Sequence, residues 1–443
     1  IAGYNKSALD VHGKLTLTNS EISNSNGYSI YFDTDDVPFM YYNTFKNNAN
    51  CMYNKNSADT IDVSYNYWGS PNGPSIYDTT TSQWIGDGDK IGSGFTYTPY
   101  FVTETKYPLT YDKGFSRKTP GNYTRSFTDM TVAAPGFDIQ FTRTYNSLNT
   151  KSTLMGKGWT FGYECRVKNA EYSYVDLTGK TVTGTIPSVV IVNLPDGSTQ
   201  SFNVKKGGTY VAADSRNTLT KENGTYKLTT KTQENYYFNA DGYLVKMEDK
   251  NGNKVDIEVD SSGKITGIKD QLGRHYTITY ENNMIKSIKE DGSQITVVYG
   301  YENGRLVSVK DPAGNYTYYT YSTNGLLSSI QDAAHKPVET VVYYQTTDDK
   351  DKINKLTNST GNTDTYVYDN VNRKITITDS KNNYTVKWYD DSYNVTTMRD
   401  KEGRITAYEY NQYSEIKSET DRNNNTTQYE RDSKGNNQDY KPR

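Results

Sequence analysis

The sequence contains few of the aliphatic residues from which globular cores are built. Hydrophobic residues, with Tyr and Cys included, make up 33% of the 443 residues, and 43 residues are Tyr. Ordinary globular domains have about 45–50% apolar residues on a count that includes Gly and leaves Tyr out. We therefore expect no deep aliphatic core. No stretch approaches the roughly 20 apolar residues that cross a bilayer, so we expect no membrane partner.

Neither sign of charge is in excess, and Cys and His are scarce. Lys and Arg total 49 and Asp and Glu total 52, a net charge of −3, which does not indicate a nucleic-acid partner. The two cysteines, Cys51 and Cys165, cannot make a disulfide framework. The histidines, His12, His275 and His335, have no Cys, Asp or Glu at the spacing of metal ligands. The sequence predicts no catalytic, metal or cofactor site.

Tyrosine is abundant where aliphatic residues are missing. There are 43 Tyr against 12 Phe, together with 34 Gly. A Tyr ring packs while its hydroxyl reaches water or a partner, which suits a thin sheet that is wet on one or both faces. The low net charge and the abundance of Thr, Val and Ile argue against disorder. We expect an all-β fold of about three domains.

Three segments near the N-terminus repeat at a spacing of 23 residues. They are LTLTNSEISNSNGY (15–28), PFMYYNTFKNNANC (38–51) and IDVSYNYWGSPNGP (61–74). Their apolar residues form two columns, Leu17 with Met40 and Val63, and Ile22 with Phe45 and Trp68. Asn recurs at the expected bends. This pattern is typical of the coils of a parallel β-helix, in which side chains stack between coils and Asn bonds the backbone at corners.

The stretch YNYWGSPNGP and the later GDGDKIGSGFTYTPYF resemble the last coil and tail of secreted right-handed β-helix proteins. The resemblance covers residues 1–104 and implies the C-terminal coils of such a helix.

Two functional alternatives belong to this region. Some β-helices are polysaccharide lyases with acidic calcium ligands, and the dense acidic group here is Asp33, Asp35 and Asp36. A solvated turn is the favoured interpretation of that group, and a lyase remnant is the alternative. Sugars stack on exposed aromatic rings, so Tyr41 and Tyr65 are possible glycan contacts of an adhesin or carbohydrate-binding module. A ladder of Tyr packing on itself is the simpler interpretation.

A second region, 105–210, contains GNYTRSFTD, PGFDIQFTRTYNS, GKGWTFGYE and NLPDGSTQSF. These resemble the segment that opens the repeat region of Rhs and wall-associated bacterial proteins. Alternate residues from Ile139 to Tyr145 would line one face of a strand. Glycines surround Trp159 and would let the backbone bend around a buried indole. We interpret Arg143, Tyr145 and Trp159 as anchors of this plug segment, and a binding site is the alternative.

The third region, 211–443, repeats one turn. An Asp is followed three residues later by Gly or Asn and then by Arg or Asn: Asp249–Gly252–Asn253, Asp270–Gly273–Arg274, Asp311–Gly314–Asn315, Asp379–Asn382–Asn383, Asp400–Gly403–Arg404 and Asp421–Asn424–Asn425. Several copies are 21 residues apart, and Tyr-rich alternating strands such as HYTITY lie between them. Asp can bond the backbone of such a turn, and Gly supplies its positive φ. Each unit is predicted to be a β-hairpin.

The repeats contain the motif D-x-x-G-R, followed by a Tyr and then by G-x-L-x-S-I. This motif resembles the YD repeat of Rhs proteins, toxin-complex shells and teneurins. The resemblance implies one continuous antiparallel sheet that spirals into a hollow shell or barrel, here incomplete. In bacterial relatives the shell encloses a C-terminal toxic domain. This chain has no self-cleavage segment or variable domain after its repeats, and DPAG at 311–314 is an ordinary turn.

We therefore expect a non-enzymatic fragment of a bacterial Rhs/YD-repeat protein that is secreted, extracellular or associated with the cell wall, with a Gram-positive host favoured. It would serve as a scaffold, as a shell for cargo or in surface display. Its partner would be its own C-terminal domain or a cell-surface glycan, and self-assembly is possible. The sequence starts without Met and stops inside a repeat, as a piece of a longer polypeptide would.

Overall fold

The computed structural model describes residues 7–442 except 59, 105–109, 113–117, 135–137, 150, 176–180, 206–207, 213, 346–347 and 433–434. These residues form strands and turns without an α-helix, so the prediction of an all-β fold is confirmed. Within them there is likewise no helix of the length and hydropathy that a membrane span requires.

The chain divides into two compact units. Unit 1 contains Ile1–Lys113, Lys168–Ile191 and Ser201–Val211, and unit 2 contains Gly114–Val167, Val192–Gln200 and Ala212–Arg443. The plug segment predicted over 105–210 is thus shared between the units, whereas the predicted coils fall in unit 1 and the repeats in unit 2.

Unit 1 begins with strands that stack in parallel as successive coils. Three sets form: β1 (Ser7–Val11) with β4 (Tyr28–Phe32) and β7 (Tyr53–Asn54), β2 (Thr16–Thr18) with β5 (Phe39–Tyr41), and β3 (Glu21–Ser23) with β6 (Thr44–Lys46). Leu17 pairs with Met40 and Ile22 with Phe45, as the two apolar columns require. The predicted coils of a parallel β-helix are confirmed.

Stacked apolar side chains and an Asn ladder hold the coils together. Phe45 and Trp68 are fully buried and stack with ring centroids 4.7 Å apart. At one corner, the Asn43 amide donates to the Leu17 carbonyl at 2.8 Å, and the Asn66 amide donates to the Met40 carbonyl at 2.9 Å. Each Asn therefore satisfies the backbone of the coil before it, where the chain turns and strand pairing stops.

Shorter strands complete the first part of the chain. β8 (Ile61–Asp62) pairs with β12 (Phe95–Thr96), and β9 (Ser75–Asp78) lies between β10 (Gln83–Ile85) and β11 (Lys90–Ile91). A five-stranded sheet has the order β13 (Thr110–Asp112), β17 (Arg166–Val175), β18 (Thr181–Asn193), β19 (Thr199–Val204) and β20 (Tyr210–Ala212). Within unit 1, Ile186 and Ile191 of β18 pack against Tyr41 and Tyr42 of the coils.

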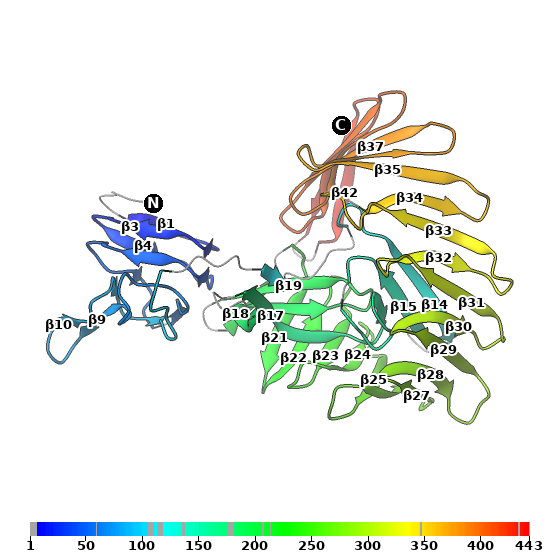
Figure 1. Cartoon of the computed structure of the whole chain (residues 1–443), viewed down its shortest axis with the longest axis horizontal. Coiled ribbons are helices and arrows are strands. Elements are labelled where there is room, and N and C mark those ends of the chain that lie inside the picture. The colour runs from blue at the N-terminus through cyan, green and yellow to red at the C-terminus, as the bar shows by residue number, and fades with distance from the viewer. Residues whose placement is uncertain are drawn as a thin grey trace. The chain divides into compact units, whose positions relative to one another are not determined.

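Unit 2 contains a small antiparallel sheet and a very large one. The small sheet has the order β14 (Thr124–Val132), β15 (Ile139–Asn146) and β16 (Trp159–Phe161). The large sheet has 22 strands in strict sequence order (Figure 1), each antiparallel to the next, which confirms the predicted continuous repeat sheet. Its strands are β21 (Thr218–Glu222), β22 (Thr225–Thr229), β23 (Asn235–Phe238), β24 (Leu244–Glu248), β25 (Lys254–Val259), β26 (Ile265–Asp270), β27 (His275–Glu281), β28 (Met284–Glu290), β29 (Thr296–Glu302), β30 (Arg305–Lys310), β31 (Tyr316–Tyr321), β32 (Leu327–Gln331), β33 (Pro337–Tyr343), β34 (Ile353–Asn358), β35 (Thr363–Asp369), β36 (Lys374–Thr378), β37 (Tyr384–Tyr389), β38 (Val395–Arg399), β39 (Ile405–Tyr410), β40 (Ile416–Thr420), β41 (Thr426–Arg431) and β42 (Asn437–Pro442).

A β-bulge recurs near the end of most hairpins of the large sheet. In the hairpin β27–β28 the register shifts between Thr279 and Tyr280, so that Tyr280 pairs with Ile285. The same shift recurs at the last Tyr of β29, β31, β33, β37 and β39. A bulge bends its strand and increases the local twist, so a bulge in each hairpin curves the whole sheet in one direction.

The last Tyr of the first strand in most hairpins also joins its hairpin to the preceding one. The Tyr280 hydroxyl donates at 2.8 Å to the carbonyl of Ile265, which lies beside the bulge of the hairpin β25–β26. The bond is repeated along the sheet: Tyr301 to Ile285, Tyr321 to Leu306, Tyr343 to Leu327, Tyr368 to Ile353 and Tyr410 to Val395, at 2.6–2.9 Å. A carbonyl that the bulge removes from the ladder is thus satisfied by the next hairpin.

This arrangement predicts that the hydroxyl of Tyr280 stabilises the sheet. Tyr280→Phe should lower the free energy of unfolding by about 1 kcal/mol, because it leaves the Ile265 carbonyl without its partner. Urea unfolding followed by tyrosine fluorescence measures the change. Tyr316→Phe is the matched control, since the Tyr316 ring is 39% exposed. Equal effects of the two substitutions would contradict a role for the bond.

Candidate functional site

The repeat turn is closed by the side chain of its first Asp. Asp270 is almost fully buried, and its Oδ1 accepts hydrogen bonds from the backbone N–H groups of Leu272 and Arg274 at 3.0 and 2.9 Å. The Arg274 guanidinium donates back to Asp270 Oδ2 at 2.6 Å. Gly273 has a φ of 83°, which an L side chain rarely adopts. Asp270 and Arg274 therefore brace one tight turn.

The same geometry recurs at the other predicted turns. The Oδ1 of Asp249, Asp311, Asp379, Asp400 and Asp421 accepts the N–H four residues on at 2.8–2.9 Å. Gly252, Gly314 and Gly403 have φ values of 79–92°. The hydrogen bond from the Asn side chain four residues on is the largest cause that holds the pKa of Asp249, Asp311, Asp379 and Asp421 below its ordinary value.

Further turns of this kind escaped the sequence pattern. Asp260, Asp332, Asp390 and Asp432 also accept the N–H four residues on. The signal that could have found them is an Asp four residues before the next strand, whatever residue follows it. The Asp side chain therefore closes turns within hairpins, as Asp260 does between β25 and β26, and turns between hairpins, as Asp270 does between β26 and β27.

His275, in β27, lies between two carboxylates. Its Nδ1 is 2.7 Å from Asp291 Oδ2, and its Nε2 is 3.2 Å from Glu258 Oε2. Partial burial would lower the pKa of His275, but the two carboxylates outweigh it and raise that pKa. Gly267 provides the space, because a Cβ there would lie 2.5 Å from His275 Nε2. The cluster is a surface ion-pair network across three hairpins.

The predicted plug anchors lie in the small sheet and contact the large one. Arg143 is 2% exposed. Its Nε donates to Asp129 Oδ2 at 2.8 Å, and its Nη2 donates to the Tyr319 hydroxyl of β31 at 2.7 Å. Tyr299 of β29 donates to the same Asp129 carboxylate at 3.0 Å. The guanidinium also lies over the rings of Phe127, Trp159 and Tyr319 at 4.5–5.1 Å.

Tyr145 and Trp159 make two more bridges of this kind. The Trp159 indole N–H donates to the Tyr321 hydroxyl at 3.0 Å, and the Leu327 backbone N–H donates to the Tyr145 hydroxyl at 2.9 Å. Both rings are at most 2% exposed. Burial would lower the pKa of Arg143, but Asp129 and the surrounding hydroxyls raise it. The three residues leave no open face for a ligand, and their contacts join the small sheet to the repeat strands.

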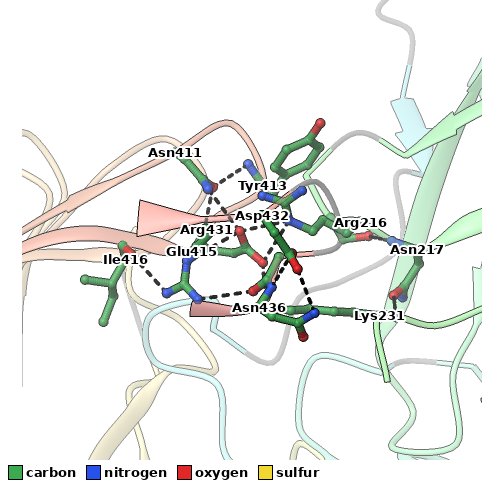
Figure 2. Close-up of polar contacts among 12 residues, drawn as sticks. Arg216, Asn217, Lys231, Asn411, Tyr413, Glu415, Ile416, Arg431, Asp432 and Asn436 are labelled. Carbon is green, nitrogen blue, oxygen red and sulfur yellow. Dashed lines mark hydrogen bonds and ion pairs between the residues drawn. The ribbon is translucent and has the colours of Figure 1, made fainter. Parts of the chain in front are cut away.

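A cluster around Glu415 joins the start of the repeat sheet to its end (Figure 2). Arg216, just before β21, donates from Nε to both oxygens of Glu415 at 3.1 and 3.0 Å, 199 residues away in sequence. Lys231 donates to Glu415 Oε1 at 2.7 Å, and the Asn411 amide donates to Oε2 at 2.9 Å. The Arg216 guanidinium also lies 4.3 Å from the centre of the Tyr413 ring.

The closing contact is largely shielded from water. The side chains of Arg216 and Glu415 are only 14% and 12% exposed, and Arg431 Nε lies 3.7 Å from Glu415 Oε2. Burial alone would raise the pKa of Glu415, but the bonds from Lys231, Asn411 and Arg216 lower it to about 2. The strands β21 and β40 therefore belong to one turn of a curved sheet. The sequence pattern missed this contact, because no local spacing connects residues so far apart.

The candidate residues of the coils are mostly buried or paired. Tyr41 is 3% exposed and donates to Asp62 at 3.1 Å, and Tyr65 is half-buried in the same cluster. A glycan contact requires an exposed ring, and Tyr41 does not have one, because residues of β18 cover it. Glycan binding by the coils stays a prediction. Asp33 pairs with Lys55 at 2.9 Å and Asp36 with Lys205 at 3.5 Å.

The structure offers little support for a metal or thiol site. In the part of the chain that it describes, no group of three or more His, Cys, Asp or Glu residues could hold a metal ion. Cys51 and Cys165 are free thiols, and burial raises the pKa of both. Raised thiol pKa values disfavour the reactive thiolate.

Two regions of the chain match the models of known protein families. Residues 119–183 match a domain of unknown function, DUF6531, and residues 301–336 match the RHS repeat. The second match covers β30, β31 and β32, and the hairpins around it have the same Asp-capped turns and Tyr bonds. The chain contains an RHS repeat. The predicted Rhs/YD-repeat family is thus confirmed. Among curated proteins, none matches the sequence.

Solved structures similar to this RHS-repeat protein include toxin complexes. The Tc holotoxin pore of Photorhabdus luminescens has 12% identity over 70% of this chain and 20% of that chain, with a TM-score of 0.34. The TcdB2–TccC3 crystal structure has 12% identity over 84% and 24%, with a TM-score of 0.30. A porin-like protein from Bacteroides uniformis has 13% identity over 45% and 91%, with a TM-score of 0.21. The chain spans about a quarter or less of the two toxin chains.

Removing the charge of Glu415 should weaken the closing contact. Glu415→Gln removes the largely buried negative charge that Arg216, Lys231 and Arg431 share, and we expect a loss of about 3 kcal/mol in the free energy of unfolding. Hydrogen exchange should accelerate in both β21 and β40. Glu409→Gln is the control, because its pair with Lys417 is largely exposed and worth under about 1 kcal/mol. Unchanged exchange in β21 would contradict the contact.

The contribution of Glu415 should depend on pH with a definite sign. Its pKa is lowered from an ordinary 4.5 to about 2 in the folded protein. A lowered pKa stabilises the folded state above the ordinary value, and this stabilisation is lost as the pH falls toward 2. The difference in unfolding free energy between wild type and Glu415→Gln should be constant above about pH 5 and shrink below it. Denaturant titrations at several pH values measure it, and a pH-independent difference would refute the assignment.

Proposed function

We propose that the chain is a non-enzymatic wall segment of a secreted or cell-surface RHS-repeat protein, and that it helps to enclose a C-terminal cargo domain. The closing contact supports this proposal most directly. A sheet that bends at each hairpin and meets its own beginning at Glu415 and Arg216 can surround a space. The plug anchors, fixed to the repeat strands by Arg143, support the same role, because they would brace the wall from one side.

The toxin complexes among the similar structures suggest a toxic cargo, and surface display is the alternative use of the same wall. The glycan-binding role proposed for the coils has weaker support, since Tyr41 is buried. A lyase remnant has little support, because Asp33 and Asp36 are occupied by lysines.

Electron microscopy of the purified chain tests the wall, and a fused reporter tests enclosure. We expect images of a curved sheet around an open space, and a solid globule would contradict the proposal. A protease-sensitive reporter domain fused after Arg443 should be cleaved more slowly than the same reporter fused before Ile1. Glu415→Gln should remove the difference. Equal cleavage rates in the wild-type fusions would count against enclosure of cargo but not against a scaffold.

A further inference from the structure

Unit 2 contains a pocket of ≈ 310 Å³ at the turn ends of the strands β35–β38. Its wall includes Thr119 and Pro120 and the tyrosines Tyr368, Tyr389 and Tyr393. The volume lies at the lower end of the range of small-molecule sites, about 300–1,000 Å³. The pocket therefore has room for one small ligand.

The pocket lies beside the hairpin β35–β36, which lacks the β-bulge that most other hairpins have. The hairpin β35–β36 pairs without a register shift, so Tyr368 lies opposite Ile375 and no bulge forms. In the neighbouring hairpins the register shifts at Tyr343 and Tyr389. Tyr389 occupies the position from which the other tyrosines donate to a bulge carbonyl, and its own hydroxyl has no hydrogen-bond partner among the described residues. A donor that the fold leaves unused therefore lies in the pocket wall.

Tyr393 is held in a conformation that favours glycine. Its φ is 61°, three residues after Asp390. In most other repeat turns this position is Gly or Asn: Gly252, Gly273, Gly314, Asn382, Gly403 and Asn424. His335, another large residue there, stacks on Tyr318 at 4.0 Å, whereas Tyr393 is 42% exposed and stacks on no ring in the described part of the chain. A bulky residue at positive φ without a stacking partner is the kind of local strain that gathers at functional sites.

Most charged groups around the pocket are paired, and the carboxylate of Asp390 accepts hydrogen bonds from the backbone N–H groups of Ser392 and Asn394 and from the Asn394 amide. Lys352 bonds Asp349 at 2.8 Å, and Lys374 pairs with Asp369 at 3.2 Å. Arg373 pairs with Asp391. An anionic or cationic ligand would have to displace one of these pairs, so the wall favours a neutral ligand that offers hydroxyl groups and apolar faces.

We propose that this pocket binds a neutral pyranose sugar. The C–H face of a pyranose ring packs on an aromatic ring, and the exposed face of Tyr393 offers such a surface. The Tyr389 hydroxyl in the wall can bond a sugar hydroxyl, whereas the Asn370 amide already accepts from Lys352 and donates to Asp349. The cations of the wall are paired and Asp390 adds a negative charge, which disfavours uronic acids and sugar phosphates. The site is independent of cargo enclosure and lies in the repeat sheet, far in sequence from Tyr41 and Tyr65.

Titration of the whole chain with glucose, galactose and N-acetylglucosamine, followed by saturation-transfer NMR and calorimetry, tests this site. We expect saturable binding of at least one of them with a dissociation constant of about 1 mM or below. Tyr393→Asn should weaken that binding at least tenfold without lowering the melting temperature, because Asn tolerates the positive φ better than Tyr. Tyr389→Phe should also weaken binding at unchanged stability, because the hydroxyl that it removes bonds none of the residues that the structure describes.

Tyr316→Phe, an exposed ring elsewhere on the sheet, is the control and should bind like wild type. Glucuronate and glucose 6-phosphate should bind more weakly than glucose. The proposal is overturned if none of the neutral sugars binds, if the charged sugars bind more tightly, or if Tyr393→Asn and Tyr389→Phe bind as wild type does. If no sugar binds, the proposed role as a wall segment is unaffected, because that role rests on the curvature of the repeat sheet and on the contact between Arg216 and Glu415.

Discussion

The hydrogen bond from a tyrosine hydroxyl to a bulge carbonyl of the preceding hairpin sets the form of the repeat sheet. A bulge bends the strand but removes a backbone carbonyl from its ladder. Tyr280, Tyr301 and Tyr321 restore that bond from the next hairpin at 2.6–2.8 Å. The bulge that bends a strand thus also supplies the carbonyl that binds the next hairpin, and this pairing is repeated along the sheet. A chain poor in aliphatic residues can build a large wall in this way, because each unit is stabilised by its neighbours rather than by a deep core.

Curvature alone does not close a sheet, and two buried charge clusters determine where the curve ends. At Glu415, three cationic side chains and the Asn411 amide surround one carboxylate, which makes the contact specific as well as stable. At Arg143, the Asp129 carboxylate, the Tyr319 hydroxyl and three aromatic rings surround one guanidinium, and the Tyr299 hydroxyl donates to the same carboxylate. Buried charges tolerate few alternative partners, because leaving either one unpaired is costly. The clusters therefore fix the register of distant segments, which the repeated hairpins by themselves leave open.

The hairpin β35–β36 shows the consequence of losing the β-bulge in one repeat. Without a bulge beside Ile375, the Tyr389 hydroxyl is unused and a pocket opens. The strained Tyr393 lies beside it, where other turns have Gly or Asn. A repeat protein gains a distinct site in this way, since one altered unit can carry a function while the units around it keep the fold.

The sequence by itself determined the all-β class, the coil register from Leu17 to Met40, and the turns at Asp249, Asp270 and Asp400. These features are local or periodic, so residue spacing carries them. The tertiary structure decided that Tyr41 is buried, that Asp129 neutralises Arg143, and that Arg216 meets Glu415. Spacing could not reveal these contacts, because they depend on how far many bulges together rotate the sheet. A small bend per hairpin, summed over 22 strands, decides which distant side chains meet.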